Sequence, residues 1–404
     1  MFEKIKQFFS TGARDSELDK RLEELRNRTP VPVFWLYGKT QSGKSTVVKF
    51  LTGADEAEIG EGFKPCTKFS NQYQFPTEEA PLLNFLDTRG VDEPGYDPTE
   101  DLERFHDLAH IVIVTVKVMD HAVEHLVEHV SKIRQANANR PIVLVLTCLH
   151  EAYPQQQHPQ PYDGVAWLDE EAKDSVEIPQ ELRDSINEQL RRFEGLYDHC
   201  VPIDITKPDE GFEEPNYGGE KLKQVLLDSL PDVFRQTLIT LDSATHELQD
   251  LYARHAVPHI VGFSSMAATA GAIPIPGIDL LIVPGIQTRM IYHLAQFYGQ
   301  PLTGNRFLEL AGTLGIGMLT RAVARQAFKF IPIVGSVVGA GVAFASTFAL
   351  GKAFCYYYSA VHKGQVPKKE DIQTYYKEQL AVAEQAWKKK QAAAKEAKNE
   401  EAKT

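Results

Sequence analysis

Short apolar runs alternate with amphipathic stretches along the first half of the chain. Residues 31–37, 82–86, 111–116 and 142–146 are almost continuously apolar, as expected for strands buried inside a protein. Stretches of helical period separate these runs, and such alternation predicts a mostly parallel sheet with helices on both faces. We therefore expect an α/β fold over residues 30–230.

The second half of the chain has a different pattern, which predicts an all-α, strongly apolar helical domain over residues 231–365. An amphipathic helix from about residue 232 to 255 leads into two uncharged runs, 256–278 and 331–351. About 20 apolar residues can span a bilayer as a helix. Both runs are nevertheless rich in Gly, Ala and Ser, a composition that suits close helix packing. Membrane association and a soluble bundle with two very apolar central helices are the two interpretations.

The ends of the chain are predicted to be helical. Residues 1–29 form a charged lead-in whose first turns, with Phe2, Ile5 and Phe8, are amphipathic. Such a helix either packs onto a neighbouring domain or lies on a membrane surface. Residues 366–404 are rich in Ala, Lys and Glu, and predict a solvated helix that frays in part.

Composition narrows the possible partners and compartment. The 404 residues exceed the size of one ordinary domain, and the four cysteines have neither metal-like spacing nor a disulfide framework, which suits a reducing compartment. The net charge of -12 argues against a nucleic-acid partner. Residues 254–366 nevertheless carry eight basic and only two acidic residues. Basic side chains beside apolar runs suit anionic lipid headgroups, so we expect a lipid bilayer as a partner.

A phosphate-binding pattern follows the first apolar run. The pattern G-x-x-x-x-G-K-[ST] is spelled by Gly38-Lys39-Thr40-Gln41-Ser42-Gly43-Lys44-Ser45, and Thr46 continues into a predicted helix. The two glycines let the loop turn its N–H groups toward a phosphate, Lys44 supplies a cation, and Ser45 supplies a hydroxyl ligand for Mg²⁺. The start of the helix adds the positive end of its dipole.

Two further motifs follow in the order that a GTPase requires. The run 82–86 leads into Asp87-Thr88-Arg89-Gly90, where the carboxylate can hold the Mg²⁺ water shell and the Gly90 N–H can meet a γ-phosphate. Thr67 lies between the two motifs, in a loop that can close on magnesium. The predicted metal ligands are therefore Ser45, Thr67 and Asp87.

With these motifs, residues of about 30 to 230 resemble an Era-like G domain, and the phosphate loop is closest in style to septin-related and immunity-related GTPases. The resemblance implies that GTP or GDP binds with Mg²⁺. It also implies two switch loops, around Thr67 and residues 87–92, that order on the γ-phosphate and relax after hydrolysis.

Base recognition departs from this family. The family carries [NT]-K-x-D after the strand that corresponds to residues 141–146, and this chain has Thr147-Cys148-Leu149-His150. We place Thr147 and His150 at the base, with Glu151 as a possible substitute for the missing carboxylate. The loop 203–207 occupies the place of the family's fifth motif without spelling it.

Hydrolysis also departs from the common pattern. Val91 follows Gly90 where many GTPases have a glutamine, and an aliphatic side chain cannot orient the attacking water. Lys44 and Thr67 remain the catalytic candidates, together with either Gln41 or a residue from a second G domain across a homodimer. We expect intrinsic turnover of GTP to be slow or to need stimulation.

The apolar half has a resemblance of its own. The segments that carry it are Ala272–Asp279, Ile286–Ile291, Tyr298-Gly299 and Ile331–Gly335. With them, residues of about 235 to 365 resemble a bacterial C-terminal domain of unknown function that is often fused to Era-like G domains in inner-membrane proteins. The resemblance implies membrane association, by insertion or by a helical hairpin, with the G domain on the cytoplasmic side.

One other pattern points to different chemistry. Residues 121–129 hold two overlapping H-x-x-E-H strings, a spacing known from zinc proteases. They lie where the G-domain fold places a crossover helix, so a solvated helix face is the favoured interpretation.

Two classes of function stay open at this point. The first is a membrane-associated GTPase that acts as a conformational switch or remodels membranes. The second is a nucleotide-gated scaffold with little hydrolysis and a soluble helical bundle.

Overall fold

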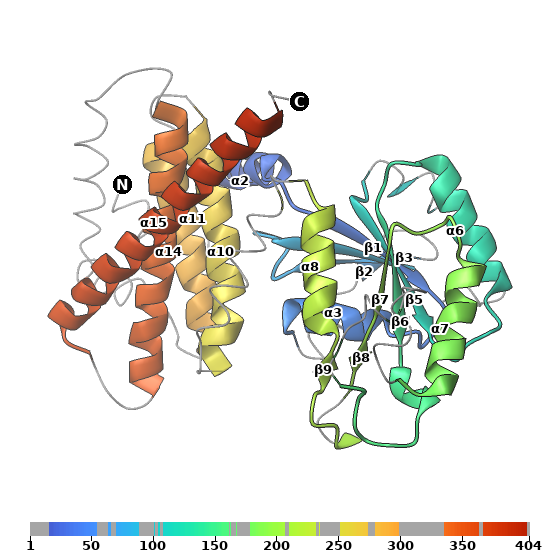
Figure 1. Cartoon of the computed structure of the whole chain (residues 1–404). Coiled ribbons are helices and arrows are strands. Elements are labelled where there is room, and N and C mark those ends of the chain that lie inside the picture. The colour runs from blue at the N-terminus through green and yellow to red at the C-terminus, as the bar shows by residue number, and fades with distance from the viewer. Residues whose placement is uncertain are drawn as a thin grey trace. The chain divides into compact units, whose positions relative to one another are not determined.

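The structure is a computed structural model, and the chain falls into two compact units (Figure 1). The described residues are 16–54, 64–65, 70–88, 101, 104–105, 108–160, 162, 167, 178–206, 210–231, 234, 251–273, 279–298, 335–362 and 367–401. The sheet unit comprises Val31–Phe75 and Leu83–Arg235, and the helical unit comprises Met1–Pro30, Pro76–Leu82 and Gln236–Thr404.

The sheet unit is built on a seven-stranded sheet with the order β2-β3-β4-β1-β5-β6-β7. Its strands are β1 (Val33–Gly38), β2 (Lys64–Pro65), β3 (Ser70–Phe75), β4 (Leu83–Thr88), β5 (Ile111–Lys117), β6 (Ile142–Thr147) and β7 (His199–Pro202). The strands β4, β1, β5, β6 and β7 pair parallel with their neighbours in that series. At the other edge, β3 pairs antiparallel with both β4 and β2. This arrangement confirms the predicted mostly parallel sheet.

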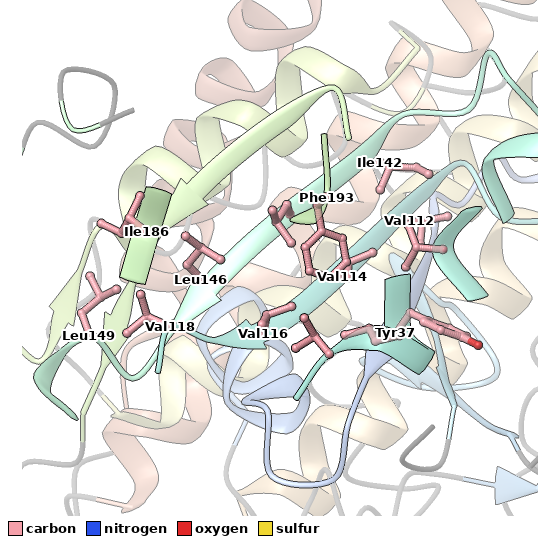
Figure 2. Packing of buried hydrophobic residues seen from close by; sticks show 14 of the residues in the cluster. Tyr37, Val112, Val114, Val116, Val118, Ile142, Leu146, Leu149, Ile186 and Phe193 are labelled. Carbon is pink, nitrogen blue, oxygen red and sulfur yellow. The ribbon is translucent and has the colours of Figure 1, made fainter. Parts of the chain in front are cut away.

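Helices cover both faces of this sheet, α6 and α7 on one and α3 and α8 on the other (Figure 1). They are α3 (Lys44–Thr52), α6 (Glu124–Ala136), α7 (Gln180–Arg192) and α8 (Gly219–Ser229), with the 3₁₀ helix η1 (Leu149–Ala152) and a small ladder of β8 (Asp204–Ile205) and β9 (Asn216–Tyr217). Figure 2 shows part of the hydrophobic core on this face, a cluster that includes Val112, Val114 and Val116 of β5 together with Ile186 of α7 and Phe193. Burial on both faces explains why the parallel strands read as continuous apolar runs.

This topology places the site. The strands β1, β4, β5 and β6 run parallel and therefore end at the same edge of the sheet. The phosphate loop follows β1, Asp87 lies near the end of β4, and Thr147 ends β6. Ligands of open α/β sheets bind in the crevice at the carboxyl ends of the strands.

The helical unit is a bundle. Its described helices are α2 (Ser16–Arg28), α10 (Leu251–Ala272), α11 (Asp279–Phe297), α14 (Gly335–His362) and α15 (Lys369–Glu401). α10 and α14 approach closely at two glycines, because a Cβ on Gly271 would lie 2.7 Å from the carbonyl oxygen of Gly339. The expectation of close packing through small residues is confirmed at this crossing.

None of the helices among the described residues is both long enough and apolar enough to cross a bilayer. The runs 256–278 and 331–351 were expected to be long enough to span. With 22 and 28 residues, α10 and α14 have that length, but their described residues do not have the apolar content of a membrane span. Many Gly, Ala and Ser residues, with Lys352 inside α14, dilute the apolar content of these helices. Residues 274–278 and 331–334 lie outside the described residues.

The two ends of the chain belong to this bundle. Leu22 and Leu25 of α2 are buried, while the amphipathic residues 2–9 lie outside the described residues. α15 was expected to be solvated, but one of its faces packs on α14, where the rings of Trp387 and Phe344 lie 5.5 Å apart. The indole of Trp387 buries a large apolar surface in this contact, which holds α15 on α14 along part of its length.

Candidate functional site

The phosphate loop connects β1 to α3 and depends on its two glycines. A Cβ on Gly38 would lie 2.5 Å from the carbonyl oxygen of Thr115, so the backbone passes too close to β5 for any other residue. Gly43 has a φ of +92° and caps the start of α3 in the left-handed region. The sequence pattern and the local backbone therefore agree, and the amino end of α3 opens onto the loop.

Lys44 holds its charge inside this loop. The residue is only 8% exposed, and its Nζ donates to the carbonyl oxygens of Gly38 at 3.0 Å and Lys39 at 2.9 Å. A buried ammonium surrounded by a loop of backbone groups is suited to a phosphate, because charge-assisted bonds to phosphate are stronger than bonds to carbonyls.

Neighbouring strands hold the loop in place. The Ser42 and Thr115 hydroxyls lie 2.6 Å apart, and both residues are buried. Thr147 Oγ1 donates to the Ser42 carbonyl at 3.0 Å, which ties the end of β6 to the loop. The loop is therefore ordered before a ligand binds, so ligand binding costs little conformational entropy in the loop.

Asp87 places a carboxylate near the end of β4, at the edge of the sheet where the phosphate loop lies. Its Oδ1 is buried and has no hydrogen-bond partner among the described residues. Burial raises the pKa of this carboxyl to about 6, although the Lys44 charge opposes the shift. A buried, unsatisfied carboxylate beside the phosphate loop fits Mg²⁺, which prefers oxygen ligands.

The other residues of the predicted magnesium site are only partly described. Ser45 is exposed at the start of α3, whereas Thr67 and Gly90 lie outside the described residues. The described part of the chain has no cluster of three or more His, Cys, Asp or Glu side chains that could hold a metal. A magnesium ion here would take its remaining ligands from phosphate and water, as is usual for nucleotide sites.

The remaining loop side chains differ in exposure. Thr40 and Gln41 are exposed, Thr46 is half-buried, and Gln41 has a φ of +60°, which is uncommon for a residue with a side chain. Lys39 pairs with Asp120 at 2.8 Å, in the segment after β5. The assignment of Gln41 to hydrolysis stays a prediction.

The structure brings His150 to a buried carboxylate that the sequence analysis did not assign. His150 lies in η1, directly after β6, and its Nδ1 lies 2.9 Å from both carboxylate oxygens of Asp204. Oδ2 of Asp204 also accepts the His150 backbone N–H at 2.6 Å. The hydrogen bond that the His150 ring donates to Asp204 raises the pKa of His150 above its usual value.

Glu151, the other candidate for the missing carboxylate, is used elsewhere. Its Oε1 lies 2.8 Å from Lys117 Nζ at the end of β5. Asp204 is 1% exposed and follows the buried residues Val201 and Ile203. Its place directly after a buried strand is a local sequence feature, but that feature does not identify His150 as its partner.

The H-x-x-E-H strings do not form a metal site. His121 and His125 are exposed, and the His129 ring packs edge-on against Tyr37 at 6.4 Å. Leu126, Val130 and Ile133 form the buried face of α6. The interpretation as a crossover helix with a solvated face is consistent with this structure.

Two family comparisons match separate parts of the chain. The family described as 50S ribosome-binding GTPase matches residues 33–148, which carry the phosphate loop and Thr147. The domain of unknown function DUF697 matches residues 239–385, which lie in the helical unit.

A relative and two solved structures are also similar. Magnetosome membrane protein 22 of Magnetospirillum gryphiswaldense is 29% identical over 160 residues, which cover 36% of this chain and 80% of the relative. The bacterial selenocysteine-specific elongation factor EF-Sec aligns with a TM-score of 0.29 and 17% identity, over 50% of this chain and 29% of that one. The translation elongation factor SelB of Methanococcus maripaludis, in its apo form, aligns with a TM-score of 0.27 and 17% identity, over 50% of this chain and 33% of that one.

These two elongation factors are much longer than the part that aligns, so this chain spans about a third of their length or less. The chain thus contains a GTP-binding domain of the GTPase type, matched over residues 33–148, followed by a helical domain of unknown function, matched over residues 239–385.

Proposed function

We propose that this chain is a membrane-associated, Mg²⁺-dependent GTPase of the Era-like type that works as a conformational switch. GTP binds in the loop 38–45, and Mg²⁺ is held by Ser45, Thr67 and Asp87. Turnover to GDP and phosphate is slow or stimulated, with the water positioned by Gln41 or by a second G domain. The observation that carries this proposal is the path of the chain between the two switch segments.

That path passes through the helical unit. The strands β3 and β4 belong to the sheet unit, whereas the turn between them, Pro76–Leu82, belongs to the helical unit. β3 begins at Ser70, just after the segment with Thr67, and β4 ends at Thr88, just before Gly90. The two strands pair antiparallel from Ser70 opposite Thr88 to Phe75 opposite Leu83.

Charged and steric contacts hold the turn among the helices. Glu79 lies 3.5 Å from Arg289 and 3.2 Å from His293, both on α11. Its hydrogen bond with His293 is the main reason that the pKa of Glu79 is lowered. Arg26 of α2 donates to the Glu78 carbonyl at 3.2 Å.

Ala80 packs under α10 in the same turn. A Cβ on Gly262 would lie 2.3 Å from the Ala80 carbonyl oxygen, so only glycine leaves room for the turn at this point. Both switch segments are thus continuous with a paired hairpin whose turn is anchored among helices. A rearrangement of the switches on loss of the γ-phosphate has a direct covalent route to the helical unit.

Membrane association is supported by charge and by the relative. The segment 254–366 has an excess of basic residues, and basic side chains attract anionic headgroups. The similar magnetosome protein is named as a membrane protein. We place the G domain on the cytoplasmic side of a bacterial inner membrane, with the bilayer as a partner, no nucleic acid, and a G-domain homodimer as the candidate active assembly.

Phosphate release tests this function. Purified full-length chain is incubated with Mg²⁺ and GTP, with and without vesicles that contain an anionic lipid, and the Lys44→Ala variant serves as the blank. The switch predicts turnover that rises with vesicles. Tight GTP binding with no release under either condition would instead support the nucleotide-gated scaffold.

Hydrogen exchange tests the route to the helices. Exchange in residues 76–82 and in α11 should differ between the GDP state and the state with a non-hydrolysable GTP analogue. Glu79→Gln should reduce that difference, because the turn loses its ion pairs, whereas Glu128→Gln on α6 should leave it unchanged. Identical exchange in both nucleotide states would contradict the proposed coupling.

A further inference from the structure

We infer that His150, held by Asp204, reads the purine base, and that its Nε2 accepts one hydrogen bond from N1–H of guanine. This inference rests on the proposed nucleotide site, because the phosphates must sit in the loop 38–45 for the base to reach η1. It assigns base selection to a pair of side chains in place of the carboxylate that the [NT]-K-x-D motif provides.

The position of His150 follows from its attachment to the phosphate loop. Thr147, three residues earlier, donates to the Ser42 carbonyl of the loop at 3.0 Å. η1 begins at Leu149, so His150 stands at the same edge of the sheet as the loop. Its side chain is 34% exposed, which leaves the ring accessible to a ligand.

Asp204 determines which ring nitrogen faces the ligand. Asp204 is 2% exposed in its side chain, and both of its oxygens lie 2.9 Å from Nδ1. A carboxylate accepts hydrogen bonds, so Nδ1 carries the proton. Among the described residues, the hydrogen bonds of this ring all run through Nδ1. In the neutral ring Nε2 is therefore an acceptor.

An imidazole acceptor reads guanine differently from a carboxylate. A carboxylate has two oxygens and can accept from both N1–H and the 2-amino group of guanine, whereas Nε2 has one lone pair. The 2-amino group is then unread, and an inosine nucleotide, which has N1–H but no 2-amino group, should bind about as well as the guanosine nucleotide. Adenine has an acceptor at N1 and is rejected by the neutral ring.

Protonation reverses this preference. His150⁺ donates through Nε2–H, which matches the N1 acceptor of adenine and opposes the N1–H of guanine. The charged and titratable groups around the ring are Asp204, Glu151 and Glu210, which favour the proton, and His158, whose charge would oppose it. The guanine-to-adenine affinity ratio should therefore rise with pH across the range where His150 loses its proton.

Surrounding side chains hold Asp204 in place on its other side. Nδ1 of the buried His158 lies 3.9 Å from Asp204 Oδ2 and 2.7 Å from the Tyr153 hydroxyl. The His158 ring stacks between Phe212 and Tyr217, with centroids 4.6 Å and 4.4 Å away. This packing leaves the pair His150–Asp204 a defined geometry, as base recognition requires.

Calorimetric titrations of full-length chain with Mg²⁺ and GDP, IDP and ADP test the inference. We expect GDP and IDP to bind within about twofold of each other, where a second hydrogen bond to a charged acceptor would give about tenfold or more. The ratio of GDP to ADP affinity should increase between about pH 6 and about pH 8.5. A tenfold preference for GDP over IDP would overturn the inference.

Variants separate His150 from its neighbours. In Asp204→Asn the amide can donate to Nδ1, which leaves Nε2 as the donor, so the GDP-to-ADP ratio should fall by about tenfold. The double variant His150→Asp/Asp204→Asn restores a carboxylate with two acceptors and should gain a preference for GDP over IDP. At the high-pH end of this range, where the His150 ring is neutral, Glu151→Gln should leave every ratio unchanged, and a change there would assign base reading to Glu151 and overturn the inference. At lower pH the loss of the Glu151 charge should favour the neutral ring and raise the GDP-to-ADP ratio.

The outcomes distinguish this inference from the proposed function. If no purine diphosphate binds to the folded chain, the proposed function fails. If diphosphates bind but the base ratios do not respond to the His150 and Asp204 variants, only the inference fails. Circular dichroism and the thermal midpoint of each variant establish that it is folded, and the double variant provides a gain that misfolding cannot mimic.

Discussion

The two ends of the candidate nucleotide site are built differently, although both lie at one edge of the same sheet. At the phosphate end, Lys44 bonds to the carbonyls of Gly38 and Lys39, all within one loop. At the base end, His150 depends on Asp204, 54 residues further along the chain. Under the proposed function, affinity comes from backbone groups and one buried cation, while the inferred base selectivity comes from the two side chains His150 and Asp204.

The two ends therefore also contribute differently to the free energy of nucleotide binding. A charge-assisted bond to phosphate acts on every nucleotide alike, whereas base reading enters only as a difference between two ligands. Changes at the phosphate end should therefore alter all affinities together, and changes at the base end should alter their ratios. The following substitutions test that separation.

Lys44→Ala should have the largest effect. It removes the cation from the loop, and we expect affinity for GTP and GDP to fall by about 100-fold or more. Titration calorimetry measures this, with Lys49→Ala on the same helix as the control. Retained binding in Lys44→Ala would show that the phosphates lie elsewhere.

Asp87→Asn should act on stability and metal binding in opposite directions. Burial raises the pKa of this carboxyl to about 6, so the folded state binds its proton more tightly than the unfolded state does, and the ionised form costs stability at neutral pH. The neutral amide should raise the free energy of unfolding of the nucleotide-free protein by about 2 kcal/mol. It should also remove the Mg²⁺ dependence of GTP binding.

Denaturant unfolding at neutral pH and GTP titrations with and without Mg²⁺ check the two effects of Asp87→Asn. A loss of stability would show that Asp87 makes a structural contact in the free protein. Undiminished Mg²⁺ dependence would remove Asp87 from the predicted metal site.

Thr147→Val tests the connection between the two ends. The substitution keeps the shape of the side chain and removes the bond from Oγ1 to the Ser42 carbonyl, worth about 1 kcal/mol. We expect affinities for GDP, IDP and ADP to fall together by about fivefold. A change confined to one base would place Thr147 at the base and not under the loop.

Lys39→Gln should have the smallest effect. Lys39 is partly exposed and paired with Asp120 at 2.8 Å, and such pairs contribute about 1 kcal/mol or less. GTP affinity should change by less than about threefold in calorimetric titrations. A loss as large as that of Lys44→Ala would make Lys39 a phosphate ligand.

The contrast between the two ends also explains what could be predicted from the sequence. The loop 38–45 was readable because its glycines and Lys44 act through adjacent backbone positions, and the buried parallel strands gave continuous apolar runs. Asp204 was missed because its role depends on a contact across the fold, between β8 and η1. Spacing along the chain carries no record of such a contact.

The helical half shows a related limit. Close packing through small residues was predictable from the Gly, Ala and Ser content of the two apolar runs, and Gly271 and Gly339 supply the close approach between α10 and α14. The turn Pro76–Leu82 was not predicted to join the helices, because its anchors Arg289 and His293 lie more than 200 residues away on α11, and no local pattern around them marks them as partners of the turn.

A crystal structure of the full-length chain with Mg²⁺ and GDP tests the central claim most directly. The account predicts the phosphates in the loop 38–45 and guanine N1 within hydrogen-bond distance of His150 Nε2, with Nδ1 still on Asp204. Phosphates bound away from Lys44, or a base edge that faces Glu151 with His150 turned away, would contradict it.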